Sequence, residues 1–183
     1  MAAARRDPVA FEPLYRRYLA QVYSFAYYEL GNHADAEDAT ERTFLQALAA
    51  LERFEERARP EDGDGASTFR VWLFQIARNV VANQRRQVRR RSELPLDQAA
   101  LVAGTADPAE IAVHRGEARA ALEAVARLPG DRRRALLLRF VDQMSTAEIA
   151  GVLGRSEGAV RVLIHRALRS VARDLTEPGD AAR

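Results

Sequence analysis

One segment, residues 144–168, constrains the fold of this chain more than any other. Ser145 is followed three positions later by Glu148, the pairing of a helix-capping box, so a short helix is expected to begin there. Gly154 can adopt the left-handed backbone that ends such a helix, and Ser156 can cap a second one. Two short helices joined by a tight turn form a helix-turn-helix, whose second helix lies in the DNA major groove. The segment therefore predicts a DNA-binding module made of helices.

The second helix of this segment has two contrasting faces. Val160, Ile164, Leu168 and Val171 follow helical spacing and are expected to point inward. Arginines lie off this stripe, and arginine can pair with guanine or clamp a phosphate. The simpler alternative is a helical hairpin with solvated arginines, but the caps, the turn glycine and the apolar spacing all favour DNA binding. The residues expected to contact DNA are Arg155, Ser156, Glu157, Gly158, Arg161, His165, Arg166 and Arg169.

A second basic helix is expected upstream, over residues 69–91. Seven arginines and no acid lie between Arg70 and Arg91, a pattern that attracts a phosphate backbone. Asn79, Asn83 and Gln84 could hydrogen-bond base edges, and aromatic side chains could stack on unpaired bases. In the alternative interpretation Trp72 is a core residue and the arginines form a solvated tail.

A third segment, residues 35–47, is acidic on one face and apolar on the other. This pattern favours a protein-docking helix or a solvated face. A metal site after His33 is disfavoured, because the three histidines are scattered and no paired ligand spacing occurs. We therefore expect no metal, no cofactor and no catalytic residue.

Composition narrows the function further. The chain has 183 residues, is 48% hydrophobic and 30% charged, and carries a formal net charge of +2, so it can bury a core. It contains no cysteine, which excludes disulfides and thiolate chemistry. No apolar run reaches the length of a membrane span and the N-terminus lacks an apolar signal core, so we expect a cytoplasmic protein without membrane insertion.

Helical periodicity runs through nearly the whole chain and predicts an all-α fold. It favours two small helical domains joined by a flexible linker, in which Pro95 and Gly104 break the pattern. Ile111, Ala118, Leu122 and Val125 are expected to face the core of the second domain. The expected units are a first domain at 1–91, a linker at 92–107, a second domain at 108–175 and a tail at 176–183. The expected helices include 34–54, 68–91, 108–128 and 132–141.

Three blocks of the chain together resemble a bacterial RNA polymerase sigma factor of the extracytoplasmic-function class. Asp35-Ala-Glu-Asp38 followed by Thr43-Phe44-Leu45 resembles the core of sigma region 2. Trp72-Leu-Phe-Gln-Ile-Ala-Arg-Asn79 with its arginine tail resembles the part of region 2 that reads and opens the −10 element. The helix-turn-helix, ending in His165-Arg166-Ala167, resembles region 4, which binds the −35 element.

The resemblance implies a protein that binds core polymerase, through the β′ clamp and the β flap, and reads promoter DNA while the polymerase does the chemistry. It implies a free monomer under the control of an anti-sigma factor. It assigns the predicted DNA contacts of the helix-turn-helix to the −35 element. The polymerase-docking residues it implies are Asp35, Glu37, Asp38, Glu41, Thr43, Phe44 and Leu45. The −10 residues it implies are Arg70, Trp72, Arg78, Asn79, Asn83 and Arg86.

The chain departs from the family pattern at a few positions. The loop between Phe54 and Trp72 is longer and more acidic than usual, through residues 57–67. Asn83 stands where the family often has aspartate, and Val162 and Leu163 replace polar positions of the recognition helix. We therefore assign no base contact to Val162 or Leu163.

Three other functions fit parts of the sequence. A conventional helix-turn-helix repressor or activator would bind a palindromic site as a dimer. An α-helical hydrolase would use the acidic cluster with a metal, and an adaptor would bind polymerase without reading DNA. Within the sigma-factor interpretation, the asymmetry of acidic and basic segments also suggests that the free protein holds its two domains together.

Overall fold

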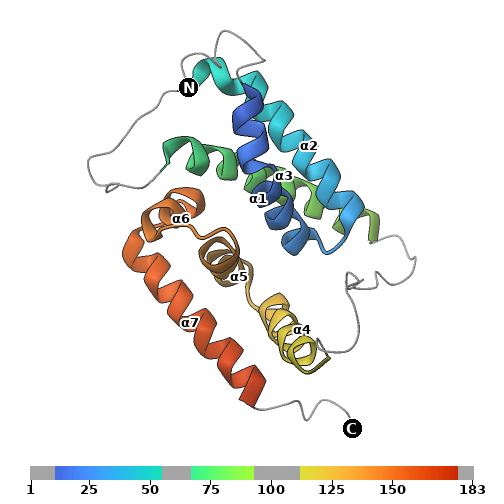
Figure 1. Ribbon diagram of the computed structural model, residues 1–183, viewed down its shortest axis with the longest axis vertical. Coiled ribbons are helices and arrows are strands. Elements are labelled where there is room, and N and C mark those ends of the chain that lie inside the picture. The colour runs from blue at the N-terminus through green and yellow to red at the C-terminus, as the bar shows by residue number, and fades with distance from the viewer. Residues whose placement is uncertain (1–10, 55–66, 93–111, 177–183) are drawn as a thin grey trace.

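The computed structural model describes residues 11–54, 67–92 and 112–176, and the described residues are helical with no strand. The prediction of an all-α fold is confirmed. Figure 1 shows two groups of helices, α1–α3 above and α4–α7 below. The first group contains α1 (Glu12–Leu30), α2 (His33–Ala50), the 3₁₀ turn η2 (Leu51–Arg53) and α3 (Thr68–Ser92). The second contains α4 (Ala112–Arg127), α5 (Gly130–Leu136), the π-helical segment η4 (Leu137–Val141), α6 (Thr146–Leu153) and α7 (Glu157–Thr176).

Local capping sets the helix ends of the first group. Gly31 ends α1 in the left-handed region at φ 83°. The Asn32 side chain accepts a hydrogen bond from the Asp35 amide at 2.8 Å and starts α2. The Ser67 hydroxyl accepts one from the Arg70 amide at 3.3 Å and caps the start of α3. The helix predicted over 34–54 is shorter, because α2 tightens into η2 after Ala50.

The hydrophobic core is continuous across both groups of helices. Phe25 of α1 meets Phe74 of α3 edge to face, with ring centroids 5.6 Å apart. The same buried cluster includes Leu138, Met144 and Ile149 from the second group. The two groups thus pack on a shared apolar interior, with α3 lying against α6 (Figure 1).

Two leucines that were predicted to face the core are exposed beside a smaller buried cluster under α7. Leu168 was predicted to face the core but is 45% exposed, while Ala167 is fully buried with Leu128 and Leu136. Ala167 lies two helical turns after Val160, so it falls at the centre of the inward stripe and Leu168 falls beside it. Leu122 is likewise 48% exposed, because Ala124 takes the inward position on α4.

The helix predicted over 132–141 begins at Gly130 and changes type within its length. After Leu136 the backbone widens into η4, where the Asp142 amide donates to the Leu137 carbonyl at 3.2 Å. The wider turn buries both Leu137 and Leu138. Gln143 follows at φ 53°, and this left-handed residue turns the chain into α6.

Several predicted features lie outside the described residues. They are most of the predicted linker, the core position assigned to Ile111, the acidic loop at 57–66 and the predicted tail beyond residue 176; the Ala118 side chain is also outside them. The domain boundaries at 91, 107 and 175 therefore stay predictions.

Candidate nucleic-acid interface

The predicted helix-turn-helix is present as α6, a turn and α7. The Ser145 hydroxyl accepts from the Glu148 amide at 3.1 Å, and Glu148 Oε2 accepts from the Ser145 amide at 2.9 Å. Gly154 ends α6 at φ 65°, and the Ser156 hydroxyl accepts from the Ala159 amide at 3.3 Å to start α7. Each of the caps and the turn glycine predicted from sequence is confirmed.

The outward face of α7 carries most of the residues predicted to contact duplex DNA. The Arg161 side chain is 68% exposed and pairs with Glu157 at 2.9 Å. His165, Arg166 and Arg169 are exposed along the same helix. A Cβ at Gly158 would meet nothing within 4 Å, so the surface there is open to a partner. Arg155 is also exposed, but its guanidinium reaches Asp131 at 2.8 Å.

The residues predicted on α3 divide into separate faces. Trp72, Asn79, Asn83 and Arg86 share one face, because they lie near multiples of the helical repeat. The two asparagines and Arg86 are exposed, and Arg86 donates to the Asn83 side-chain oxygen. Trp72 is half-buried, with its ring centroid 4.8 Å from that of Phe54.

The other two arginines predicted on α3 lie off this face. Arg78 is rotated by roughly a third of a turn from it. Arg70 lies on the opposite side, where its side chain is 13% exposed and Nη1 is 3.5 Å from Glu148 Oε2 of α6. The structure therefore brings four of the six predicted −10 residues together and directs Arg70 into the contact between α3 and α6.

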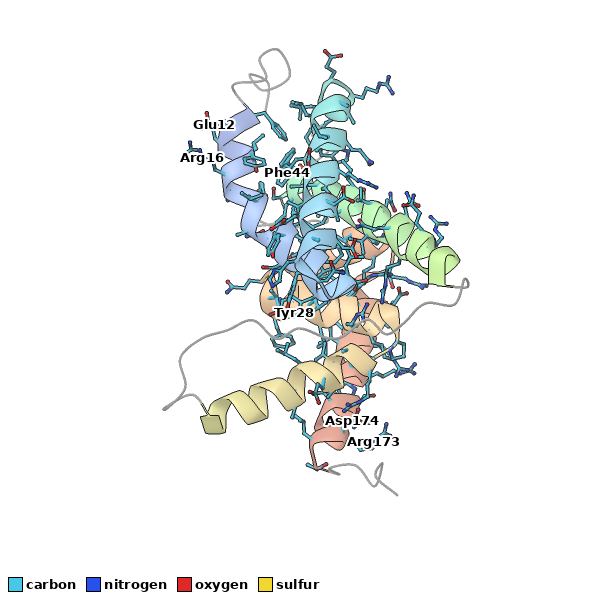
Figure 2. All side chains as sticks on the ribbon, turned by 90° about the vertical axis from the view of Figure 1, so that its right-hand side faces the viewer. Glu12, Arg16, Tyr28, Phe44, Arg173 and Asp174 are labelled. Carbon is cyan, nitrogen blue, oxygen red and sulfur yellow. The ribbon has the colours of Figure 1, made fainter. Side chains whose placement is uncertain are left out.

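The predicted docking helix, α2, forms one side of an apolar groove with α1. Figure 2 shows Phe44 directed from α2 toward α1, where its ring centroid is 4.8 Å from that of Tyr15. The groove has a volume of about 530 Å³. Its lining residues are Phe11, Tyr15, Leu19, Tyr23, Glu37, Thr40, Glu41, Phe44, Leu45 and Leu48.

The seven residues predicted for docking differ in exposure. Leu45 is 58% exposed, and Glu37 and Glu41 are exposed beside it. Thr43 and Phe44 are buried, so they hold α2 in place. The two aspartates have partners within the bundle: Asp35 Oδ1 accepts from the Gln84 amide at 2.9 Å, and Asp38 pairs with Arg42 at 3.0 Å.

Sequence reasoning did not identify an ion cluster around Glu29. The Glu29 side chain is fully buried, and Oε2 lies 2.9 Å from Arg85, 3.3 Å from Arg133 and 3.3 Å from Arg134. An acid in the last turn of a helix opposes the helix dipole. That position within an otherwise apolar and aromatic turn was the signal in the sequence.

Neither a metal site nor a membrane span occurs in the described part of the chain. Among residues 11–54, 67–92 and 112–176, no group of three or more histidine, aspartate or glutamate side chains could hold a metal ion. His33 Nδ1 instead lies 2.5 Å from the Tyr23 hydroxyl. No described helix is long and apolar enough to cross a membrane.

The fold and its surfaces define an all-α protein with exposed polar faces on α3 and α7 and an apolar groove between α1 and α2. Family models match the chain in the order predicted from the sequence: Sigma-70 region 2 over residues 14–91 and Sigma-70 region 4 over residues 118–171. The chain belongs to the sigma-70 family of RNA polymerase sigma factors, in the extracytoplasmic-function class. The family consists of regulatory proteins rather than enzymes.

Individual relatives agree with this assignment. The chain is 38% identical over 94% of its length to the ECF RNA polymerase sigma factor BldN of Streptomyces coelicolor, and it spans 62% of that protein. It is 31% identical over 98% of its length to a probable RNA polymerase sigma-C factor of Mycobacterium bovis, spanning 90% of that protein. Its fold is similar to that of sigma factor RpoE from Bartonella quintana, solved with the anti-sigma factor NepR. The TM-score is 0.67 at 21% identity, covering 95% of this chain and 99% of that one.

Proposed function

We propose that this chain binds core RNA polymerase and directs it to promoters with two elements, reading −10 DNA with α3 and −35 DNA with α7. The observation that carries the proposal is that one chain presents exposed polar faces on α3 and α7, in separate sigma regions, together with an apolar groove between α1 and α2. The domains proposed are region 2 at 1–91 and region 4 at 108–175, with a connecting linker at 92–107.

The −35 contact is assigned to the outward face of α7. Arg161, His165 and Arg169 are exposed at successive i, i+4 positions of α7, a spacing that lets a major-groove helix reach successive base edges and phosphates. The charge of the two arginines adds an attraction to duplex DNA that weakens with salt. Gly158 lets the backbone at the start of α7 approach the DNA closely.

The −10 contact is assigned to the face of α3 that carries Trp72, Asn79, Asn83 and Arg86. Taking a base out of the stack costs a few kcal/mol, and an aromatic surface with nearby hydrogen-bond donors offsets that cost. Trp72 provides an indole face beside Phe54, and the two asparagines provide amides. Arg86 adds a cation for the backbone of the opened strand.

Polymerase docking is assigned to the groove between α1 and α2, with the β′ clamp as the partner. Leu45 and Leu48 are 58% and 37% exposed at its edge, and Glu37 and Glu41 supply a charged rim. An exposed apolar patch with a polar rim is typical of a protein interface. The β flap is the expected partner of the second module, where Phe140 and Val141 are 61% and 40% exposed.

An anti-sigma factor is the proposed regulator, and the free protein is proposed to be a cytoplasmic monomer. The support is the similarity in fold to sigma factor RpoE, whose structure was solved in complex with the anti-sigma factor NepR. The same exposed apolar residues that would meet polymerase suit a competing inhibitor. The described residues contain no metal-binding cluster, so sensing is assigned to the partner.

The function is tested by reconstituted transcription with core polymerase, this protein and a library of promoter fragments. We expect protein-dependent starts that share two upstream elements. A conventional helix-turn-helix regulator would instead bind duplex sites as a dimer and give no new starts. The molecular mass of the free protein in solution also distinguishes a sigma factor from such a regulator, because the sigma factor is expected to be monomeric.

A further inference from the structure

The two sigma regions pack closely at Gly151 of α6, where there is no room for a side chain on α6. A Cβ added at Gly151 of α6 would lie 2.7 Å from Val71 Cγ1 of α3, so glycine is required for this contact. Beside it, the Gln75 amide donates to the Gly151 carbonyl at 2.8 Å. Side chains of α3, the predicted −10 helix, therefore contact the backbone of α6, the first helix of the helix-turn-helix.

This contact encloses Arg70, which the family resemblance predicts as a −10 residue. Its guanidinium donates to the Asp142 carbonyl and lies 3.5 Å from the Glu148 carboxylate. The Ser67 amide, at the start of α3, donates to the same carboxylate at 3.4 Å. With only 13% of its side chain exposed, Arg70 cannot reach DNA while α6 lies against α3.

A second set of charges joins the two regions at the C-terminal end of α1. Glu29 of region 2 accepts from Arg134 of region 4 at 3.3 Å and lies 3.3 Å from Arg133, with Arg85 of α3 at 2.9 Å. One carboxylate thus holds three guanidinium groups, two of them from the opposite region. Without Glu29 these like charges would be left in a poorly solvated place, where their mutual repulsion is strong.

We propose that the free protein is closed and self-masking: Glu29 latches region 4 onto region 2, and promoter binding requires the two regions to separate and release Arg70. The proposal rests on the function assigned above and on the sequence prediction that Arg70 contacts −10 DNA, because masking matters only if Arg70 meets promoter DNA. It identifies a charge-based latch within this chain, separate from any anti-sigma factor.

A reversible staple tests the masking directly. The distance from a Cβ at Gly151 to Val71 Cβ is 3.7 Å, inside the range of a disulfide, and the chain has no cysteine of its own. The double variant Val71→Cys, Gly151→Cys is oxidised, its bond is verified by mass, and promoter-specific initiation is measured with core polymerase. We expect oxidation to lower initiation at least about tenfold and reductant to restore it, with each single-cysteine variant insensitive to the oxidant. Full activity of the stapled protein would overturn the masking.

The latch is tested by a measurement that does not depend on transcription. Fluorophores are placed on the exposed positions Ala20 of α1 and Ala172 of α7 through introduced cysteines, and energy transfer is compared in otherwise wild-type and Glu29→Gln proteins. The matched control is Glu12→Gln, which removes an exposed carboxylate from the same helix. We expect lower transfer in Glu29→Gln alone, with helical content preserved.

The outcomes separate the latch from the assigned function. Unchanged transfer in a folded Glu29→Gln protein overturns the latch. If neither the wild-type protein nor the reduced double variant initiates transcription, the assigned function is overturned. The energy-transfer comparison then still decides whether the latch exists.

Discussion

Arg70 of α3 and Glu148 of α6 face each other across the contact between the two sigma regions, with Nη1 and Oε2 3.5 Å apart. Glu148 is also the capping carboxylate of α6, accepting from the Ser145 amide at 2.9 Å. The group that starts the helix-turn-helix thus also holds a residue predicted from the sequence to contact the −10 element. A single side chain links the local structure of region 4 to the position of region 2.

Glu148 variants should separate these two roles. Glu148→Ala removes the cap and leaves Arg70 without its carboxylate, so we expect a loss of about 1–3 kcal/mol in the free energy of unfolding. Glu148→Gln keeps a cap acceptor, because glutamine also serves in capping boxes, and should lose about 1 kcal/mol or less. Urea unfolding followed by circular dichroism measures both, and equal losses would contradict the capping role.

Arg161→Ala should weaken binding of the −35 element. Loss of a base or phosphate contact costs about 1–3 kcal/mol of binding free energy. If the contact is to phosphate, the binding affinity should also depend less steeply on salt concentration. The matched control is Arg16→Ala, which removes the same charge from the outer side of α1 (Figure 2), where the side chain is 77% exposed. Fluorescence anisotropy at several salt concentrations measures both. Equal weakening in the two variants would mean that only net charge matters.

Leu45→Glu should abolish much of the affinity for core polymerase without unfolding the protein. The side chain is 58% exposed at the edge of the groove, so a charge is tolerated in free protein but costly in an apolar interface. We expect the dissociation constant to rise at least about tenfold, or about 1.4 kcal/mol. Leu122→Glu, at a 48% exposed leucine of α4, is the control and should bind normally.

Asp142 should make stability depend on pH. Burial raises the pKa of its carboxyl from 3.8 to about 7, against the lowering effect of Arg70, and neither carboxylate oxygen has a hydrogen-bond partner among the described residues. Since the folded pKa lies above the unfolded one, this group favours folding below about pH 4, and that contribution is lost as pH rises toward 7.

Asp142→Asn removes this titration and should stabilise the protein at pH 8 by about 1–3 kcal/mol, with little change near pH 4. Urea unfolding of both proteins across this pH range measures the difference. A constant difference at every pH would show that Asp142 does not titrate within the fold.

Much of the fold was predictable because its signals are local. Ser145, Glu148, Gly154 and Ser156 act within one helical turn, so their roles could be read from spacing alone. The inward stripe of α7 was misjudged at Leu168 because side-chain size favoured leucine over Ala167, whereas helical geometry decides which position is buried.

The contacts between the two regions could not be predicted in the same way. Glu29, Arg133 and Arg134 meet only after both regions have folded, and no spacing rule connects residues so far apart in the chain. The requirement for glycine at Gly151 likewise depends on Val71 of another helix. Arg70 was identified as a DNA residue from its neighbours in sequence, and its contact with Glu148 becomes visible only in three dimensions.

The most direct test of the central claim maps transcription starts on one promoter identified in the reconstituted system, with its −10 and −35 elements changed separately. Core polymerase alone and core polymerase with Leu45→Glu serve as references. The account predicts that starts require this protein and fall when either element is changed. Starts that appear with core polymerase alone, or that survive changes in both elements, would contradict it.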